Sequence, residues 1–400
     1  MISATTSADS AATGFRDMPW QQARRLAHAS ARPVPARPAD LAQAAGLTLA
    51  QEIVTRSPAP AFDTAAMDGF AVAGAGPWQV CGAVRAGTVF PAGELQAGQA
   101  VEISTGAPVP AGADAVLPVE LAVRDADRVL GPRLTPGRHI RRTGEDAPAG
   151  TRLAPSGSRI GPALLGLAAA CGYDTLQVRP RPRIQILVTG DELVHHGRPG
   201  PGQVRDALGP MLPSLVQDMG GQAAAVCHVP DRPGALADAF AAAGAAEVLA
   251  VTGSTSVGVT DHLRSLLDKQ AARWIVDTVA CRPGHPQLLA QLADGRWVVG
   301  LPGNPYAALV AAHTLLAPLL AGLAGRRLPV LPRVPLTGQV PLSPDRTQVL
   351  PVRWDGAVAR VLGEQRSAFL NGAAIGDALA AVPAGWRGHE PAPLILPAGL

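Results

Sequence analysis

Two adjacent carboxylates, Asp191 and Glu192, follow a run of apolar and β-branched residues in the segment RPRIQILVTGDELVHHGRPG. One interpretation is that a strand ends at Thr189 and that the following glycine and two acids form a solvated turn. The other is a metal or phosphate site, because open α/β sheets bind ligands outside the carboxyl ends of their strands. This segment alone favours the turn, so the neighbouring loops must decide.

Two further loops have a similar character. In EVLAVTGSTSVGVTDHL, small and hydroxyl residues separate a predicted strand from a helix that we expect Asp261 to cap. In WVVGLPGNPYAALV, Asn304 occupies the predicted N-cap and Pro305 the first helical position. Helix N-termini offer free backbone N–H groups to anions, and glycines allow a close approach. Each loop by itself is explained equally well as a strand-to-helix turn.

The three loops would emerge together if their strands are parallel neighbours. The second and third loops would then donate N–H groups to an anion, while Asp191, Glu192 and Asp261 would supply oxygen ligands to a metal. A fourth acid, Asp231 in VPDRPGAL, follows another predicted strand and could join them. Three such loops on one edge favour a phosphate and divalent-metal site over three unrelated turns.

Other polar segments leave their role open. Arg282 and His285 flank a Pro-Gly turn in CRPGHPQLL, between two predicted strands, and a surface hairpin explains them adequately. PAFDTAAMDGFAV places Asp63 and Asp68 five residues apart, and STGAPVPAGAD places Thr105 beside a turn. These groups are either turn residues or ligand contacts.

Strand and helix patterns alternate around the three loops, which predicts a doubly wound, mostly parallel sheet. Short β-like runs punctuated by Gly and Pro predict β-rich domains on either side of it. The fold class is therefore α/β plus β, in a multidomain chain. The expected boundaries are a disordered tail at 1–15, a helical and linker domain at 16–56 and 140–178, a β-rich domain at 57–139, the α/β domain at 179–325 and a C-terminal β-rich domain at 326–400.

Composition excludes several function classes. The chain has 400 residues, with 47% hydrophobic and 16% charged, so it has enough apolar material for about two to four domains. Aromatic residues make up only 4%, and the net charge is +3, which argues against a base-stacking or basic nucleic-acid surface. No nucleic-acid partner is expected.

Cysteine spacing and hydropathy indicate the cellular compartment in which the protein is expected. The four cysteines form no CxxC pair, which argues against a zinc or redox motif, and four buried thiols in a reducing cytosol are expected. The first fifteen residues lack the features of a signal peptide. The longest apolar stretch, from Ala307, contains His313 and Pro318 and is short for a membrane span. We expect a buried helix there, in a cytoplasmic protein that does not bind membranes.

Seven segments, in order along nearly the whole chain, resemble one family, the molybdopterin molybdenumtransferases, which include MoeA and the gephyrin E domain. They are PAFDTAAMDGFAV, ISTGAPVPAGADAVLPVE, RRTGEDAPAG, VTGDEL, VTGSTSVGVTD, RPGHP and GLPGNP. The resemblance implies an elongated four-domain homodimer, with an active site between the molybdopterin-binding sheet domain of one subunit and the β domains of its partner.

The reaction that the resemblance implies uses magnesium and molybdate. Adenylated molybdopterin is hydrolysed, molybdenum enters the dithiolene of the pterin, and AMP leaves. This is the last common step of molybdenum cofactor biosynthesis. The implied partners are the molybdopterin adenylyltransferase and apo-molybdoenzymes. A phosphoanhydride cleavage agrees with a predicted site that combines a metal with anion donors.

The resemblance also assigns residues. The catalytic positions that it implies are Asp68, Asp146, Glu192, Asp231 and Asp261. Of these, Glu192 and Asp261 are the expected metal ligands, while Asp191 holds its turn. The implied substrate-binding positions are Thr105, Thr189, Gly190, Gly253, Ser256, Gly258, Arg282, His285, Pro302, Gly303, Asn304 and Pro305.

Several positions depart from the family pattern. Ala65 stands where SAMDG has serine, Ser254 where TGG has its second glycine, and Leu208 where an Asp-Ser-Asn run has asparagine. Arg282 and His285 replace the two lysines of KPGKP. Arginine keeps a permanent charge that suits oxyanions, whereas an unperturbed imidazole titrates near ~6.5 and is largely neutral in the cytosol.

Two hypotheses of different class follow. The first is an active molybdenum insertase with a retuned anion site. The second is a non-catalytic or weakly active paralogue that binds molybdopterin or a related nucleotide. The retained acids favour the first, because stability alone gives no reason to keep them. A generic nucleotide pyrophosphatase is a weaker alternative, since it would not require the β-domain motifs.

Overall fold

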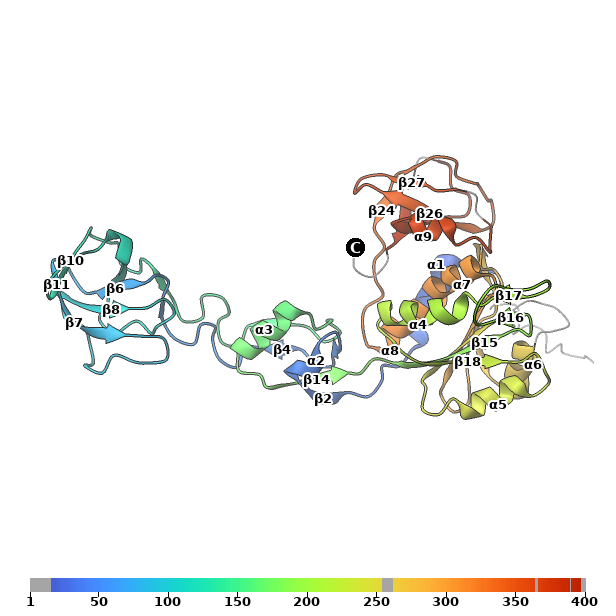
Figure 1. The fold of residues 1–400 in the computed structure, drawn as a ribbon, viewed down its shortest axis with the longest axis horizontal. Helices are drawn as coiled ribbons and strands as arrows, with labels where there is room; N and C mark the ends of the chain where they lie inside the picture. Colours follow the sequence, from blue (N-terminus) through green and yellow to red (C-terminus); the bar gives the residue numbers. More distant parts are fainter. Residues whose placement is uncertain (1–15, 254–261, 364–365, 389, 397–400) are drawn as a thin grey trace, which may run out of the picture. The chain divides into compact units, whose positions relative to one another are not determined.

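The computed structural model describes residues 16–253, 262–363, 366–388 and 390–396 (Figure 1). The chain divides into two compact units. Unit 1 contains residues 1–37 and 179–400, and unit 2 contains residues 38–178.

Unit 1 is built around a six-stranded sheet in the order β18-β15-β19-β23-β22-β20. The bounds are Gln222–Val229 for β18, Arg183–Thr189 for β15, Val248–Thr252 for β19, Trp297–Leu301 for β23, Leu288–Gln291 for β22 and Arg273–Val276 for β20. Strand pairs from β18 to β23 are parallel, and only β22 runs antiparallel to its neighbours β23 and β20. The predicted mostly parallel sheet is confirmed.

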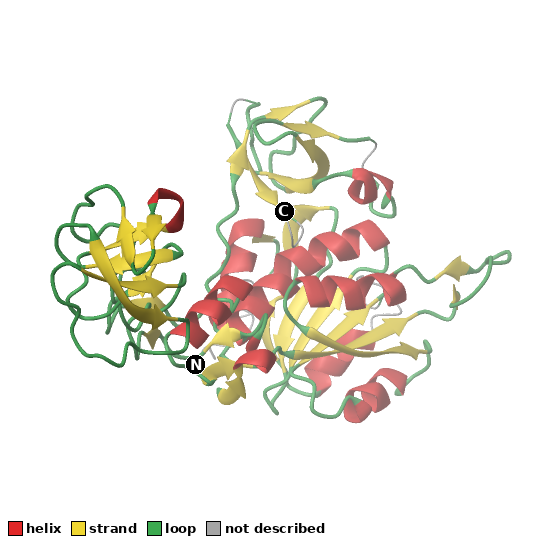
Figure 2. Cartoon of the chain, turned by 60° about the vertical axis from the view of Figure 1, so that its left-hand side comes forward, coloured by secondary structure: helices red, strands yellow, loops and turns green. Residues whose placement is uncertain are grey.

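Helices cover both faces of this sheet (Figure 2). Successive side chains of a strand point to opposite faces. Ile184, Ile186 and Val188 of β15 therefore pack with α1, α4, α7 and α8, whereas Leu187 packs with α5 and α6. The bounds are Trp20–Ser30 for α1, Leu208–Asp218 for α4, Ala235–Ala242 for α5, His262–Lys269 for α6, Pro305–Ala311 for α7 and Ala317–Leu323 for α8. Burial on both faces explains why the central strands are almost entirely apolar.

A long helix follows β23, as the sequence predicts. A π-helical turn, Ala312–Leu316, joins α7 to α8. The combined helix Pro305–Leu323 is long and apolar enough to cross a membrane by length and composition, but most of it is buried inside the structure. Its side chains belong to the core shared with the sheet, which accounts for its apolar composition.

The first helix differs from the predicted grouping. Helix α1 packs against α8 in unit 1, and the Trp20 indole donates a hydrogen bond to Thr314 Oγ1 at 2.9 Å. Residues 38–56, which the prediction had grouped with α1, lie in unit 2. The reason is that the buried face of α1 meets the apolar helix after β23.

A second, eight-stranded sheet of unit 1 contains the C-terminal strands. Its main path is β1-β21-β26-β28-β29-β24, and β27 and β25 extend it from β26. The bounds are Met18–Pro19 for β1, Val279–Arg282 for β21, Thr347–Trp354 for β26, Ala378–Val382 for β28, Ala392–Ile395 for β29, Arg333–Val334 for β24, Ala359–Val361 for β27 and Leu336–Thr337 for β25. The short helix α9, Asn371–Ile375, packs against β26. Two strands of this sheet, β1 and β21, therefore come from outside residues 326–400.

A small arm follows β15. Strands β16, Leu193–Val194, and β17, Val204–Arg205, pair in parallel and enclose the residues between them. Helix α4 begins shortly after β17.

Unit 2 consists mainly of short strands. Its largest sheet has the order β10-β11-β7-β8-β6-β9, with bounds Val123–Asp125, Arg128–Leu130, Trp78–Val84, Gln99–Ile103, Gly69–Val72 and Ala115–Pro118. The smaller sheets pair β12 (Ile140–Arg141) with β5 (Thr64–Ala65), β13 (Arg152–Ala154) with β4 (Ile53–Val54), and β14 (Thr175–Arg179) with β2 (Arg37–Asp40) and β3 (Thr48–Leu49). The helices are α2, Leu41–Ala44, and α3, Pro162–Ala170, with a 3₁₀ turn at Val119–Leu121.

The four cysteines are free, but they are not all buried. Cys171 and Cys281 are buried, whereas Cys81 and Cys227 are exposed. The expectation of four buried thiols was wrong for two of them, because Cys227 lies on the edge strand β18 and Cys81 on an outward-facing part of β7.

Candidate functional site

The ends of β15, β19 and β23 meet at the carboxyl edge of the parallel sheet. Thr189 is buried, and its hydroxyl donates a hydrogen bond to the Thr252 carbonyl at 2.7 Å. The Gly253 N–H donates to the Leu301 carbonyl at 3.2 Å. A Cβ on Gly303 would lie 3.4 Å from Gly253 Cα. The described residues at which the three loops begin are therefore neighbours.

Glycine is required at two of these positions. Gly253 has φ +90°, and a Cβ there would lie 2.6 Å from Thr189 Oγ1. Gly190 has φ +140°, and a Cβ there would lie 2.7 Å from Glu192 Oε2. Both backbone conformations are ones that side chains with a Cβ rarely adopt. The glycines thus permit the close packing of the strand ends.

The carboxylate of Glu192 lies over Gly190 and is exposed. Its backbone is held by the arm, since the Val204 N–H donates to the Glu192 carbonyl at 2.8 Å. Among the described residues, no hydrogen bond or ion pair occupies the Glu192 carboxylate. The Glu192 carboxylate thus lies exposed beside the end of β15.

Asp191 and Asp231 join the loops after β15 and β18. The Asp231 N–H donates to Asp191 Oδ1 at 3.1 Å, and the Asp191 N–H donates to Asp231 Oδ2 at 3.4 Å. The Asp191 carboxylate therefore fixes the backbone of the neighbouring loop at Asp231. Each carboxylate keeps one oxygen outside this pair.

A cavity of about 230 Å³ opens beside Thr189 and Asp231. Arg232, His262 and Lys269 also line it. Sequence reasoning missed these three, although Lys269 is the only lysine of the chain. Two of them carry permanent positive charge, which suits an anionic ligand.

The third loop begins α7 as predicted. Asn304 is the N-cap residue, and its carbonyl accepts the Ala308 N–H at 2.9 Å. Pro305 occupies the first turn. The Asn304 side chain makes no capping hydrogen bond and is exposed, while Pro302 is buried beneath the loop.

The RPGHP segment follows β21. Arg282 is exposed at the end of that strand, and its peptide bond to Pro283 is cis. The imidazole of His285 is paired with an acid, because its Nε2 lies 2.6 Å from Asp17 Oδ1. Asp17 in turn donates its backbone N–H to Thr278 Oγ1 at 2.7 Å. No sequence signal connected Asp17 with His285, which lie 268 residues apart.

In unit 2, Asp68 and Thr105 are in direct contact. The backbone N–H and the hydroxyl of Thr105 donate to Asp68 Oδ1 at 2.6 and 3.0 Å. The N–H of Thr105 contributes most to holding the pKa of Asp68 below its usual value, followed by the hydroxyl, and the charge of Arg85 adds to it. Asp68 is thus an exposed, firmly ionised carboxylate.

A cavity of about 320 Å³ lies beside Asp68. Arg85 and Arg124 line it, and both guanidinium groups bind Glu102, at 2.6 and 3.2 Å. Arg85 also donates to Ser104 Oγ at 3.3 Å. Sequence reasoning missed these two arginines, because neither belongs to a recognisable motif.

The remaining acids of unit 2 have different environments. Asp63 is used structurally, since its carboxylate accepts hydrogen bonds from Arg142 Nη1 at 2.6 Å and from the Thr143 N–H and hydroxyl at 2.8 and 2.9 Å. Asp63 therefore ties the PAFDTAAMDG segment to RRTGED. Asp146 is exposed, and its backbone N–H donates to the Ala59 carbonyl at 3.0 Å.

Two departures from the family pattern are buried. Ala65 is fully buried in a core of unit 2, so a hydroxyl there would not face solvent. Leu208 joins the core of unit 1 and donates its backbone N–H to Asp206. Ser254, Ser256, Gly258 and Asp261, including the predicted cap by Asp261, lie outside the described residues.

The chain is similar to known proteins over most of its length. A model of the MoeA N-terminal region, domains I and II, matches residues 18–172, and one of a probable molybdopterin binding domain matches residues 185–322. Molybdopterin molybdenumtransferase 2 of Mycobacterium tuberculosis is 37% identical over 312 residues, which cover 73% of this chain and 76% of that protein. The molybdopterin molybdenumtransferase of Synechococcus elongatus is 36% identical over 289 residues, which cover 68% and 72%.

A solved structure supports the same relationship. The molybdopterin biosynthesis MoeA protein from Pyrococcus horikosii aligns with a TM-score of 0.76 at 26% identity, covering 95% of this chain and 99% of that chain. The sheet with its strand-end loops and the added β-rich parts define a multidomain transferase of the MoeA type. The chain belongs to the molybdopterin molybdenumtransferase family, which acts in molybdenum cofactor biosynthesis.

Proposed function

We propose that the chain inserts molybdenum, taken up as molybdate, into adenylated molybdopterin, with a magnesium-dependent hydrolysis that releases AMP. The observation that carries this proposal is that the three strand-end loops begin side by side, where Glu192 presents an exposed carboxylate beside glycines that permit close approach. Membership of the family supports the choice of substrate.

The donor set at this edge fits magnesium. Mg²⁺ takes oxygen ligands and usually keeps several waters. Glu192 offers an exposed carboxylate, and Asp191 and Asp231 each keep one oxygen outside their mutual hydrogen bonds. We assign Glu192 and Asp261 as the metal ligands. When bound, the ion would act as a Lewis acid toward the phosphoanhydride.

The other residues at the edge bind and orient the substrate in this proposal. The Thr189 hydroxyl holds two strand ends together, and Gly190, Gly253 and Gly303 leave room for a phosphate. Arg232 and Lys269 supply positive charge from the adjoining cavity. Asp231, fixed by Asp191, orients the attacking water.

Arg282 is the proposed oxyanion contact of the RPGHP segment, because its guanidinium is exposed and permanently charged. His285 differs, since its ring nitrogen is already paired with Asp17. We therefore propose that His285 affects the electrostatic potential around the oxyanion and does not donate a hydrogen bond to it.

In unit 2, Asp68, Thr105 and Asp146 are proposed to take part in the same reaction. Asp68 is held ionised by Thr105, so it can accept a hydrogen bond from the substrate. The proposal includes a cytoplasmic homodimer that receives its substrate from a molybdopterin adenylyltransferase and delivers its product to apo-molybdoenzymes.

The test is to incubate the purified chain with adenylated molybdopterin, Mg²⁺ and molybdate and to follow AMP. Glu192→Gln should keep the fold and lower AMP release by at least about tenfold to a hundredfold, the loss seen when even outer partners of a metal site are removed. Glu390→Gln is the matched control, because Glu390 is exposed in the C-terminal part of the chain.

The outcomes separate the two functions considered. Full activity of Glu192→Gln would remove that residue from the mechanism. Tight binding of adenylated molybdopterin by the wild-type chain without AMP release would instead identify a non-catalytic molybdopterin-binding paralogue.

A further inference from the structure

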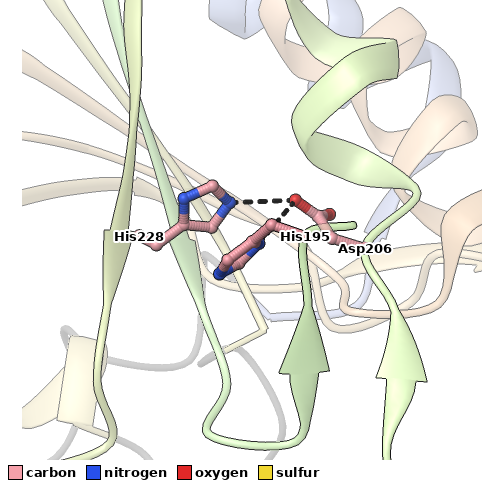
Figure 3. A group of neighbouring side chains, drawn as sticks. All are labelled: His195, Asp206 and His228. Atoms are coloured by element: carbon pink, nitrogen blue, oxygen red, sulfur yellow. Dashed lines mark hydrogen bonds and ion pairs between the residues drawn. The ribbon is translucent and has the colours of Figure 1, made fainter. Parts of the chain in front are cut away.

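Two histidines and one acid from three chain segments converge (Figure 3). His195 follows β16, Asp206 follows β17, and His228 lies on β18. Their ligand atoms all lie within 4.8 Å of one another. His228 Nε2 and His195 Nδ1 lie 3.0 and 3.7 Å from the same oxygen, Asp206 Oδ2.

The carboxylate of Asp206 is oriented toward the two rings by its other oxygen. Asp206 Oδ1 accepts the N–H groups of Leu208 and Gly209, both at 2.9 Å, and the side chain is only 5% exposed. A Cβ on Gly209 would lie 2.2 Å from Asp206 Oδ2, so this position keeps space for the carboxylate. Hydrogen bonds of this kind commonly fix the carboxylate ligands of metal sites.

The two imidazoles lie against each other on the same side of the Asp206 carboxylate (Figure 3). Their ring centroids are 3.5 Å apart, with a tilt of 41°. A hydrogen bond to Asp206 accounts for only one of them, because His195 Nδ1, at 3.7 Å from Oδ2, lies beyond hydrogen-bond distance. One divalent cation between the three side chains would engage both rings and the acid together.

We propose that His195, Asp206 and His228 bind a first-row divalent transition metal ion, for which zinc is the probe. Two imidazoles and a carboxylate suit such ions, whereas magnesium prefers oxygen ligands alone. Ligand atoms of a tetrahedral zinc ion, at bond lengths of about 2.0–2.2 Å, lie roughly 3.3–3.6 Å apart. The distances of 3.0 and 3.7 Å from Asp206 Oδ2 bracket that range.

The remaining coordination position faces solvent. The side chains of His195 and His228 are 40% and 37% exposed, so an ion can enter and a water can complete the site.

The two histidines lie close in sequence to the loops that carry Glu192 and Asp231. His195 follows Glu192 by three residues, and His228 precedes Asp231 by three. A bound ion would link the arm at β16 and β17 to strand β18. It would therefore restrain the loops that carry Glu192 and Asp231 through side chains other than the proposed magnesium ligands.

The test uses the full-length chain, stripped of metal and titrated with Co²⁺ in excess Mg²⁺. Histidine-bound cobalt absorbs visible light, so binding is followed without an activity assay. The wild-type chain should take up one cobalt ion that zinc displaces. His195→Ala and His228→Ala should each weaken binding by at least about tenfold.

Two variants serve as controls. His196→Ala should bind cobalt like the wild-type chain, because His196 is the exposed neighbour of His195 and lies outside the cluster. Glu192→Gln should also keep the cobalt spectrum, even if it loses AMP release. This separates the proposed transition-metal site from the proposed magnesium-dependent function.

Absence of a cobalt spectrum in the wild-type chain would overturn the proposal. A spectrum that persists unchanged when both histidines are replaced would overturn it too. Circular dichroism checks the fold of each variant, and His195→Gln with His228→Gln replaces the alanine pair if that pair does not fold.

Discussion

Asp191 and Asp231 hold each other through the main chain. Each donates its backbone N–H to the carboxylate of the other, at distances of 3.4 and 3.1 Å. Since the two residues follow different strands, β15 and β18, this pair joins two loops at the carboxyl edge of the sheet. The acid next to Glu192 thus has a positioning role.

Replacement of Asp191 tests this role. Asp191→Ala removes the acceptor for the Asp231 N–H, at a cost of about 1 kcal/mol, or roughly fivefold to tenfold in AMP release. Asp191→Asn retains an oxygen acceptor and should stay close to the wild-type rate. Equal rates for the alanine and asparagine variants would contradict the positioning role.

The contact between Thr105 and Asp68 leads to a second prediction. Thr105→Val removes the hydroxyl but keeps the backbone N–H, so the pKa of Asp68 should rise toward its usual value. AMP release should fall by roughly threefold to tenfold, the rate equivalent of one hydrogen bond. Carbon NMR of the Asp68 carboxyl measures the pKa, and Thr105→Ser should restore both properties. An unchanged pKa in Thr105→Val would show that the hydroxyl contributes nothing.

His285 offers a test of charge at the RPGHP segment. His285→Lys places a permanent cation where the imidazole now pairs with Asp17, because a lysine titrates near ~10.4. Molybdate use near neutral pH should be unchanged or improved, as judged by the KM for molybdate. His285→Ala is the comparison that removes both ring and charge. A large loss of activity in the lysine variant would instead show a specific role for the imidazole.

His313 predicts a pH dependence of stability. It lines a cavity of about 360 Å³ together with Arg24, Arg326 and Arg327. Burial, with a smaller contribution from the charge of Arg24, lowers the pKa of His313 to about 4. Because the folded chain resists protonation of this ring, its contribution to stability is complete above pH ~6.5 and is lost as the pH falls toward 4.

Urea denaturation measures this effect. Lowering the pH from ~7.5 to ~5 should cost the wild-type chain about 1–2 kcal/mol more than it costs His313→Gln, which has no group to protonate there. The same pH dependence in both proteins would mean that the His313 ring is protonated without cost.

Much of the architecture could be predicted from local pattern. The apolar runs that become β15, β19 and β23 are readable because buried parallel strands are continuously apolar. The N-cap position of Asn304 followed from the Asn-Pro pair, and it was confirmed. Helix α1 was also visible as a helix, although its partner was not, because helical spacing identifies a buried face without identifying what covers it.

Contacts between distant segments could not be predicted in this way. The contact of Asp17 with His285 depends on how several elements pack, and so does the cluster of His195, Asp206 and His228. No spacing of residues in the sequence indicates either contact. The exposure of Cys227 has the same origin, since it depends on β18 being an edge strand.

By itself, the sequence determined the class of each element, the family and the set of acids worth testing, because periodicity, caps and motifs are local properties. Only the tertiary structure decided what each acid does. The Glu192 carboxylate is exposed, whereas Asp191 accepts a hydrogen bond from Asp231. Asp63 accepts a hydrogen bond from Arg142, and Asp206 lies beside two histidines. The physical reason is that a carboxylate's role depends on the N–H groups, cations and solvent around it, and folding brings those from distant parts of the chain.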